Sequence, residues 1–173
     1  ETEGEIIISE SCTLKVIVEL TYGGKTYVSA STSAEYIISE EATFHKATTV
    51  ESGSYFIVAN GYVAAPLEGT TLPAVEAAID GNNVTSAVYY ALTLEEADGG
   101  FYIKDVNGTY IYNSMMTPHK LLSGTYAPTD VWTISIADDE NCTAMIVSND
   151  YALVFQNGTF TTCPASMIPA DAV

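Results

Sequence analysis

A short stretch in the middle of the chain combines aromatic and polar side chains in a pattern suited to binding sugars. Tyr110 and Tyr112 alternate with Ile111, so a strand here would place both tyrosine rings on one face. Tyrosine rings stack on the apolar face of a sugar, and neighbouring carboxylate and amide groups bond its hydroxyls. The predicted carbohydrate site comprises Asp105, Asn107, Tyr110, Tyr112 and Asn113. Tyrosine is also a common strand residue, so the same pattern fits rings that are half buried for structural reasons alone.

Residues that could serve catalysis or bind a metal are few and lie far apart. They are Cys12, Cys142, Cys163, His45 and His119. Neither histidine sits in a nucleophile motif, and the cysteines lack the paired spacing of zinc ligands. The carboxylate clusters at 95–96 and 138–140 precede turns, where a solvated loop tip is more typical than an acid–base pair. The sequence therefore predicts no enzyme, no metal site and no cofactor.

The three cysteines leave the thiol chemistry open. Cys142 and Cys163 would lie on neighbouring strands, so a disulfide between them is geometrically conceivable. Three separate thiols, with the buried ones acting as small apolar side chains, fit the same sequence.

The charge balance excludes one class of partner. The chain has 22 acidic residues against 5 lysines and arginines, which gives a formal net charge of −17. Nucleic-acid binding draws its affinity largely from cations that neutralise phosphates, so we expect no nucleic-acid partner. The same field disfavours anionic membrane surfaces, and no apolar run approaches the roughly 20 residues of a membrane span. The charge fits a role in solubility, with capture of divalent cations as the alternative.

Composition and periodicity predict an all-β protein. The chain is 47% hydrophobic and contains 12 tyrosines, and turn residues recur at short intervals. Apolar residues alternate from Leu14 to Leu20 with the period of a strand that buries one face. Gly23-Gly24 then fits a two-residue hairpin turn. We therefore expect an N-terminal β-hairpin region at 1–50 and a separate domain at 51–173.

The second region repeats one strand–turn–strand pattern. The copies are centred on Asn60-Gly61, Asn107-Gly108 and Asn149-Asp150, each preceded by an apolar strand and followed by a tyrosine. Three such units of about four strands, closed around a threefold axis, predict a β-trefoil-like domain without exposed strand edges. A β-sandwich built from the same strands is the alternative. Trp132 is expected in the core, and 73–79 fits a short helical turn.

Three motifs give residues 51–163 a family resemblance. They are Gly53, Tyr55, Ile57, Asn60, Gly61 and Ala64, then Ile103, Asp105, Gly108, Tyr110 and Tyr112, then Trp132, Thr133 and Ile134. With these motifs the region resembles a repeat module of secreted and surface proteins of gut Bacteroidetes. The resemblance implies a β-trefoil-like fold and an extracellular or outer-membrane surface location, which fits a chain that starts at Glu1 after removal of a leader. The implied role is binding without catalysis, and the resemblance names no ligand. Together with the tyrosine pattern we expect a glycan, or a host or cell-surface protein, as the partner. A structural or adhesin-like module without a small ligand is the alternative, and a fragment of a larger hydrolase is a third reading.

Overall fold

The protein is built from β-strands. The computed structural model describes residues 12–36, 40–114, 120–137 and 143–168. Within these ranges the regular structure consists of strands and two short 3₁₀ turns, Val88–Tyr90 and Ala165–Met167. This confirms the predicted all-β class.

The chain divides into two compact units, Glu1–Glu40 and Glu41–Val173. The division falls earlier than the predicted one after residue 50. The reason is strand β5 (Glu41–His45), which pairs along its whole length with β11 (Asn83–Ala87) inside the second unit. Residues 41–50 are therefore part of the larger unit, which we call the body.

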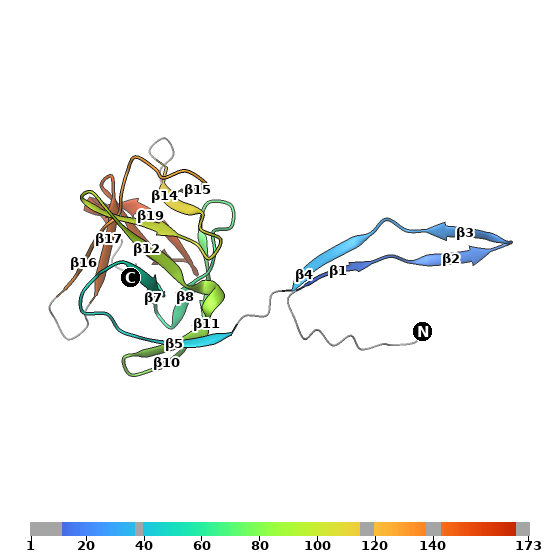
Figure 1. Cartoon of the computed structure of the whole chain (residues 1–173), viewed down its shortest axis with the longest axis horizontal. Helices are drawn as coiled ribbons and strands as arrows, with labels where there is room; N and C mark the ends of the chain where they lie inside the picture. The colour runs from blue at the N-terminus through green and yellow to red at the C-terminus, as the bar shows by residue number, and fades with distance from the viewer. Residues whose placement is uncertain (1–11, 37–39, 115–119, 138–142, 169–173) are drawn as a thin grey trace. The chain divides into compact units, whose positions relative to one another are not determined.

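The first unit is a ribbon of paired strands (Figure 1). Strand β1 (Cys12–Val16) pairs with β4 (Thr32–Tyr36), and β2 (Glu19–Tyr22) pairs with β3 (Lys25–Val28). Gly23 and Gly24 join β2 to β3 with φ of 59° and 74°, the left-handed values of the predicted hairpin turn. The expected buried face is wrong for β2–β3. Leu20 is 62% and Tyr22 77% exposed, because no second layer covers either face of this ribbon among the described residues of the first unit.

Three antiparallel sheets make up the described part of the body (Figure 1). The first runs β15 (Leu121–Gly124), β14 (Tyr110–Asn113), β13 (Gly100–Lys104), β12 (Leu92–Ala97), β6 (Gly53–Tyr55). The second runs β16 (Thr133–Ile136), β17 (Ala144–Ser148), β18 (Tyr151–Gln156), β19 (Thr159–Pro164), β9 (Leu72–Glu76), β8 (Tyr62–Ala64), β7 (Val58–Ala59). The third runs β10 (Ala78–Asp80), β11, β5. Most neighbours within a sheet are also neighbours in sequence, so short turns supply most of the connections.

The first two sheets meet at Trp132. Phe101 N–H donates to the Trp132 carbonyl at 2.9 Å and Trp132 N–H to the Phe101 carbonyl at 2.8 Å, which bridges β13 to the start of β16. The indole ring is 1% exposed, and its Nε1–H donates to the Ile111 carbonyl at 2.8 Å. Both sheets contribute to one apolar cluster around it, including Leu94, Ile146 and Phe160. The predicted core position of Trp132 is confirmed.

Each predicted repeat centre is a connection between two paired strands. Asn60-Gly61 joins β7 to β8, Asn149-Asp150 joins β17 to β18, and the loop with Asn107-Gly108 joins β13 to β14. Between the copies, β12 pairs with β13 and β16 with β17. The helical turn expected at 73–79 is wrong, because this segment supplies most of β9 and β10.

Candidate functional site

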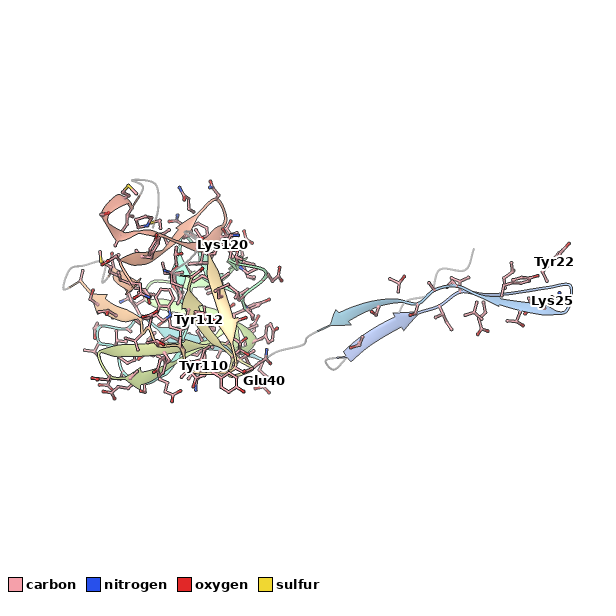
Figure 2. The ribbon with its side chains drawn as sticks, turned by 90° about the horizontal axis from the view of Figure 1, so that it is seen from above. Tyr22, Lys25, Glu40, Tyr110, Tyr112 and Lys120 are labelled. Atoms are coloured by element: carbon pink, nitrogen blue, oxygen red, sulfur yellow. The ribbon has the colours of Figure 1, made fainter. Side chains whose placement is uncertain are left out.

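Strand β14 presents the two predicted tyrosines on the outer face of the first sheet. Ile103 and Ile111, partners across β13 and β14, point inward and are buried. Alternation therefore turns Tyr110 and Tyr112 outward. Figure 2 shows them following each other along the strand. Cross-strand pairing adds three residues to the same face: Lys104 lies opposite Tyr110, and Tyr102 lies opposite Glu95. We call the set Glu95, Tyr102, Lys104, Tyr110 and Tyr112 the tyrosine face.

Lys104 is the centre of the contacts on the tyrosine face. Its ammonium forms an ion pair with Glu95 and lies 4.5 Å from the centroid of the Tyr110 ring. The Tyr102 ring meets Tyr110 edge-on, with centroids 5.5 Å apart and planes at 86°. The hydrogen bond to Glu95, followed by that to Tyr110, raises the pKa of Lys104. The group therefore stays positively charged at neutral pH, and cation–π and edge-to-face contacts hold the rings in place.

Tyr112 lies at the other end of the face, beside a position without a side chain. A Cβ added to Gly124 would lie 3.4 Å from Tyr112 Cε1 and 3.6 Å from its hydroxyl oxygen. The ring therefore lies along the Gly124 backbone on neighbouring β15. Leu122, its direct cross-strand partner, is partly exposed. A half-buried ring with a neighbouring exposed apolar side chain is a surface suited to shallow stacking.

Two polar members of the predicted site, Asp105 and Asn113, have structural roles. Asp105 Oδ1 accepts the N–H groups of Asn107 at 2.9 Å and Thr109 at 2.8 Å, so this carboxylate shapes the loop between β13 and β14. Asn107 is exposed at the loop tip. Asn113 departs from the prediction, since it is 3% exposed and accepts a hydrogen bond from Thr162 Oγ1 at 2.9 Å. Asn113 lies two residues after Ile111 on β14, so its side chain points to the same inward face of the sheet.

Sequence reasoning missed Glu95, Tyr102 and Lys104. Their place beside Tyr110 depends on the register of β12, β13 and β14, which a single sequence does not specify. One signal was present. Tyr102 and Lys104 alternate with Ile103 just as Tyr110 and Tyr112 alternate with Ile111, which is typical of paired strands that share an outer face.

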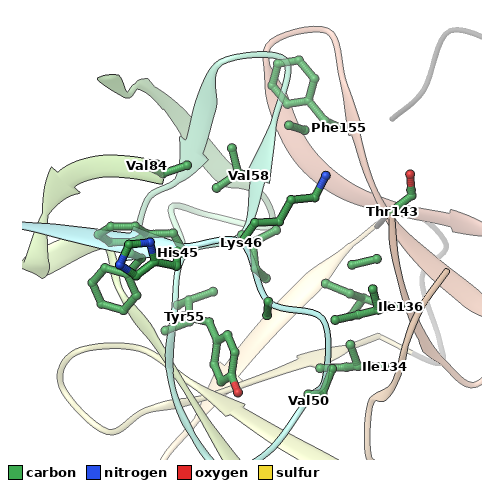
Figure 3. A pocket seen from close by; sticks show the side chains of 18 of the residues that line it. His45, Lys46, Val50, Tyr55, Val58, Val84, Ile134, Ile136, Thr143 and Phe155 are labelled. Atoms are coloured by element: carbon green, nitrogen blue, oxygen red, sulfur yellow. The ribbon is translucent and has the colours of Figure 1, made fainter. Parts of the chain in front are cut away.

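A second feature, an apolar cavity of about 440 Å³, opens between β6 and β17. Figure 3 shows Tyr55 on one side and Ile134 and Ile136 on the other, with Val50 beside Ile134. Lys46 extends across the opening toward Thr143 (Figure 3). We call this space the β6–β17 cavity.

The charge of the β6–β17 cavity differs from that of the whole chain. Its lining, drawn from the residues that the structure describes, includes Lys46 and His45 but no aspartate or glutamate. The imidazole is already engaged, with Nδ1 2.5 Å from Asn83 Oδ1. Lys46 is therefore the one lysine, arginine, aspartate or glutamate in the described lining of a cavity in a chain of net charge −17.

The remaining reactive side chains do not join either feature. Cys163 is buried on β19, and burial raises the pKa of its thiol, so the thiol stays protonated at neutral pH. Its conceivable disulfide partner Cys142 lies outside the described residues, as does His119. His45 is exposed at the cavity opening, as expected of a surface histidine.

Comparison with known proteins adds no relative. The chain matches no family model, no curated protein and no solved structure. None of the helical turns in the described part of the chain has the length and apolarity needed to cross a membrane. Function is therefore argued from the geometry of the two features above and from the sequence resemblance.

Proposed function

We propose that this protein is a non-catalytic binding module and that its tyrosine face binds carbohydrate. The observation that carries the proposal is the gathering of three outward tyrosines from two adjacent strands around the Lys104–Glu95 ion pair. Rings supply the apolar surface on which a pyranose stacks, and fixed polar groups beside them select the orientation of its hydroxyls. The structure thus supports the ligand class that the sequence suggested, with a different set of polar residues.

In this proposal each residue of the tyrosine face has a distinct role. Tyr112, at the open end beside Gly124, stacks on the sugar ring. Tyr110 and Tyr102 form the floor, since their rings are held by one another and by Lys104. Glu95 accepts hydrogen bonds from sugar hydroxyls, and Lys104 donates to them. Of the predicted residues, exposed Asn107 remains available at the neighbouring loop, whereas Asp105 only shapes that loop.

The body that carries this face is, we infer, β-trefoil-like. The support is that two kinds of strand pairing recur. Within a copy, the first strand pairs with the last, as β6 does with β12 and as β13 does with the start of β16 through a bridge. Between copies, the last strand of one pairs with the first strand of the next, as in β12–β13 and β16–β17. Hairpins β8–β9, β14–β15 and β18–β19 occupy corresponding places in the three copies. The resemblance of 51–163 supports the same fold and an exported, surface-attached location.

A glycan-array screen of the full chain, followed by titration calorimetry on any hit, tests the function. We expect Tyr110→Ala and Tyr112→Ala to weaken binding at least about fivefold, since the aromatic contacts contribute about 1 kcal/mol or more. Tyr22→Ala is the matched control, because Tyr22 is an exposed tyrosine of the ribbon. Binding that survives the two face variants would overturn the site. A screen without hits would overturn carbohydrate binding itself.

One observation favours a second candidate, an adhesin-like module that binds another protein. Strands β2 and β3 expose Leu20, Tyr22, Tyr27 and Val28. The register places Leu20, Tyr22 and Tyr27 on one face of the ribbon, and neighbouring apolar side chains on an accessible strand pair are typical of surfaces that associate with other proteins. A glycan screen without hits, together with Tyr22→Ala weakening attachment to host cells, would favour this candidate over the first.

A further inference from the structure

We propose that the β6–β17 cavity is a second binding site and that it takes a single-chain amphiphile with a carboxylate headgroup, such as a fatty acid. The acyl chain would lie inside the cavity, with the carboxylate at Lys46. This site is separate from the tyrosine face, so it stands or falls independently of carbohydrate binding.

The strand pairing explains why a cavity opens at this place. In the described part of the chain, Gly53–Tyr55 of β6 pair only with β12, and Ala144–Ile146 of β17 pair only with β16. Each strand therefore has an edge without a strand partner there, and Tyr55 of β6 and Ala144 and Ile146 of β17 line the cavity. Strands and the loops that join them both contribute to the lining, and the apolar walls come mainly from strand residues such as Leu92, Ile134 and Phe160.

The lining favours an apolar chain. Ile57, Leu92, Ile134, Ile146, Leu153 and Phe160 contribute apolar surface. At about 440 Å³ the cavity falls within the roughly 300–1,000 Å³ range of small-ligand sites. A wide apolar space offers water few hydrogen-bond partners, so methylene groups replace water there favourably.

The opening favours an anionic headgroup. Lys46 is the one lysine, arginine, aspartate or glutamate among the described lining residues. Its ammonium has no ion-pair partner among the residues that the structure describes. The Thr143 hydroxyl lies on the side of the opening toward which Lys46 extends (Figure 3). A carboxylate placed between them would receive one charge-assisted and one neutral hydrogen bond.

The overall charge of −17 does not prevent this binding. At physiological ionic strength the Debye length is about 8 Å, so distant carboxylates are largely screened. The nearby lysine, at contact distance, then dominates the local field. The long-range repulsion slows encounter with an anion more than it weakens the bound state.

Calorimetric titration of the full chain with three twelve-carbon probes, below their micelle concentrations, tests the proposal. Dodecanoate should bind saturably and more tightly than dodecanol, whereas dodecyltrimethylammonium should bind least. Lengthening the carboxylate chain by two methylenes should tighten binding about tenfold. Equal binding of the three probes, or saturable binding of none, overturns the proposal; the latter would leave an extended peptide added to the β6 or β17 edge as the occupant.

Two variants locate the site. Lys46→Gln should weaken dodecanoate about tenfold and leave dodecanol unchanged, because only the charged contact is lost. Lys25→Gln, on the ribbon, is the matched control and should change neither. Ala144→Phe fills the opening from an exposed strand position and should abolish binding of both probes, with thermal unfolding showing that the variant is folded. Unchanged binding in Ala144→Phe would place the ligand elsewhere and sink the assignment.

Discussion

Gly100 determines how closely β13 can approach the start of β16. A Cβ built on this residue would lie 2.5 Å from the Trp132 carbonyl oxygen and 3.0 Å from Val131 Cγ2. That carbonyl accepts the Phe101 N–H, so the backbone cannot retreat without stretching the bridge between the two sheets. The glycine is required for close approach and not for an unusual φ.

Gly100→Ala should therefore lower the free energy of unfolding by about 1–3 kcal/mol, the range typical of overpacking. Urea unfolding followed by tryptophan fluorescence measures it. Gly53→Ala is the control, because the nearest atom to its added Cβ is Tyr55 Cε2 at an ordinary 3.6 Å. Equal losses in the two variants would show that the contact with Trp132 does not set the cost.

The sequence predicted the burial of some single residues correctly and of others incorrectly. Trp132 was predicted in the core because its neighbours are apolar and alternate, and it is buried. Asn113 was predicted at the surface from its polarity, since asparagine is seldom buried. Its spacing of two residues from Ile111 already placed its side chain on the inward face of β14, where Thr162 donates a hydrogen bond to its amide oxygen. Strand parity thus outweighs polarity when one buried partner is available.

At the scale of elements, the loop between β13 and β14 depends on Asp105. Asp105→Ala removes the acceptor of two backbone N–H groups and should cost about 1–2 kcal/mol of stability. Asp105→Asn keeps an Oδ1 acceptor and should lose less than half of that. Thermal unfolding of the two variants makes the comparison. Asparagine as damaging as alanine would contradict this role, and would mean that the negative charge itself matters.

Strands and tight turns were well predicted, whereas the segment 73–79 was not. Gly23-Gly24 and Asn60-Gly61 adopt positive φ. Glycine and asparagine are the residues that tolerate this left-handed backbone, so the turns could be predicted from residue type. The alanines around Pro73 favoured a helical turn by intrinsic propensity. In the structure Pro73 lies opposite Thr159 of β19, and Val75 lies opposite Val63 of β8. Pairing with strands far along the chain overrode local preference.

At the scale of the whole molecule, the net charge of −17 should oppose folding by self-repulsion. Raising NaCl from about 0.01 M to about 0.1 M shortens the Debye length from about 30 Å to about 10 Å. We expect the thermal midpoint to rise by about 2–4 °C, which corresponds to about 1 kcal/mol for a chain of this size. Scanning calorimetry at several ionic strengths measures it. KCl should act like NaCl, and a midpoint indifferent to either salt would contradict the expectation.

The molecular plan was visible in the sequence only in outline. The three repeat centres were identified from asparagine, glycine and tyrosine spacing, and all three join paired strands. The unit boundary was misplaced because the partner of β5 is β11, some distance along the chain. The β6–β17 cavity was not predicted at all. Its described lining includes Val50, Tyr55, Ile134 and Ile146, residues that only the tertiary fold brings together.

The burial of Trp132 gives the protein a built-in optical reporter. This residue is the chain's one tryptophan and lies where the two large sheets of the body meet, whereas the ribbon contains tyrosines but no tryptophan. Tryptophan emission therefore follows the body alone, and far-ultraviolet circular dichroism follows strands of both units. Coincident transitions by the two signals would mean one cooperative molecule. Separate transitions would mean that the ribbon melts as a unit of its own.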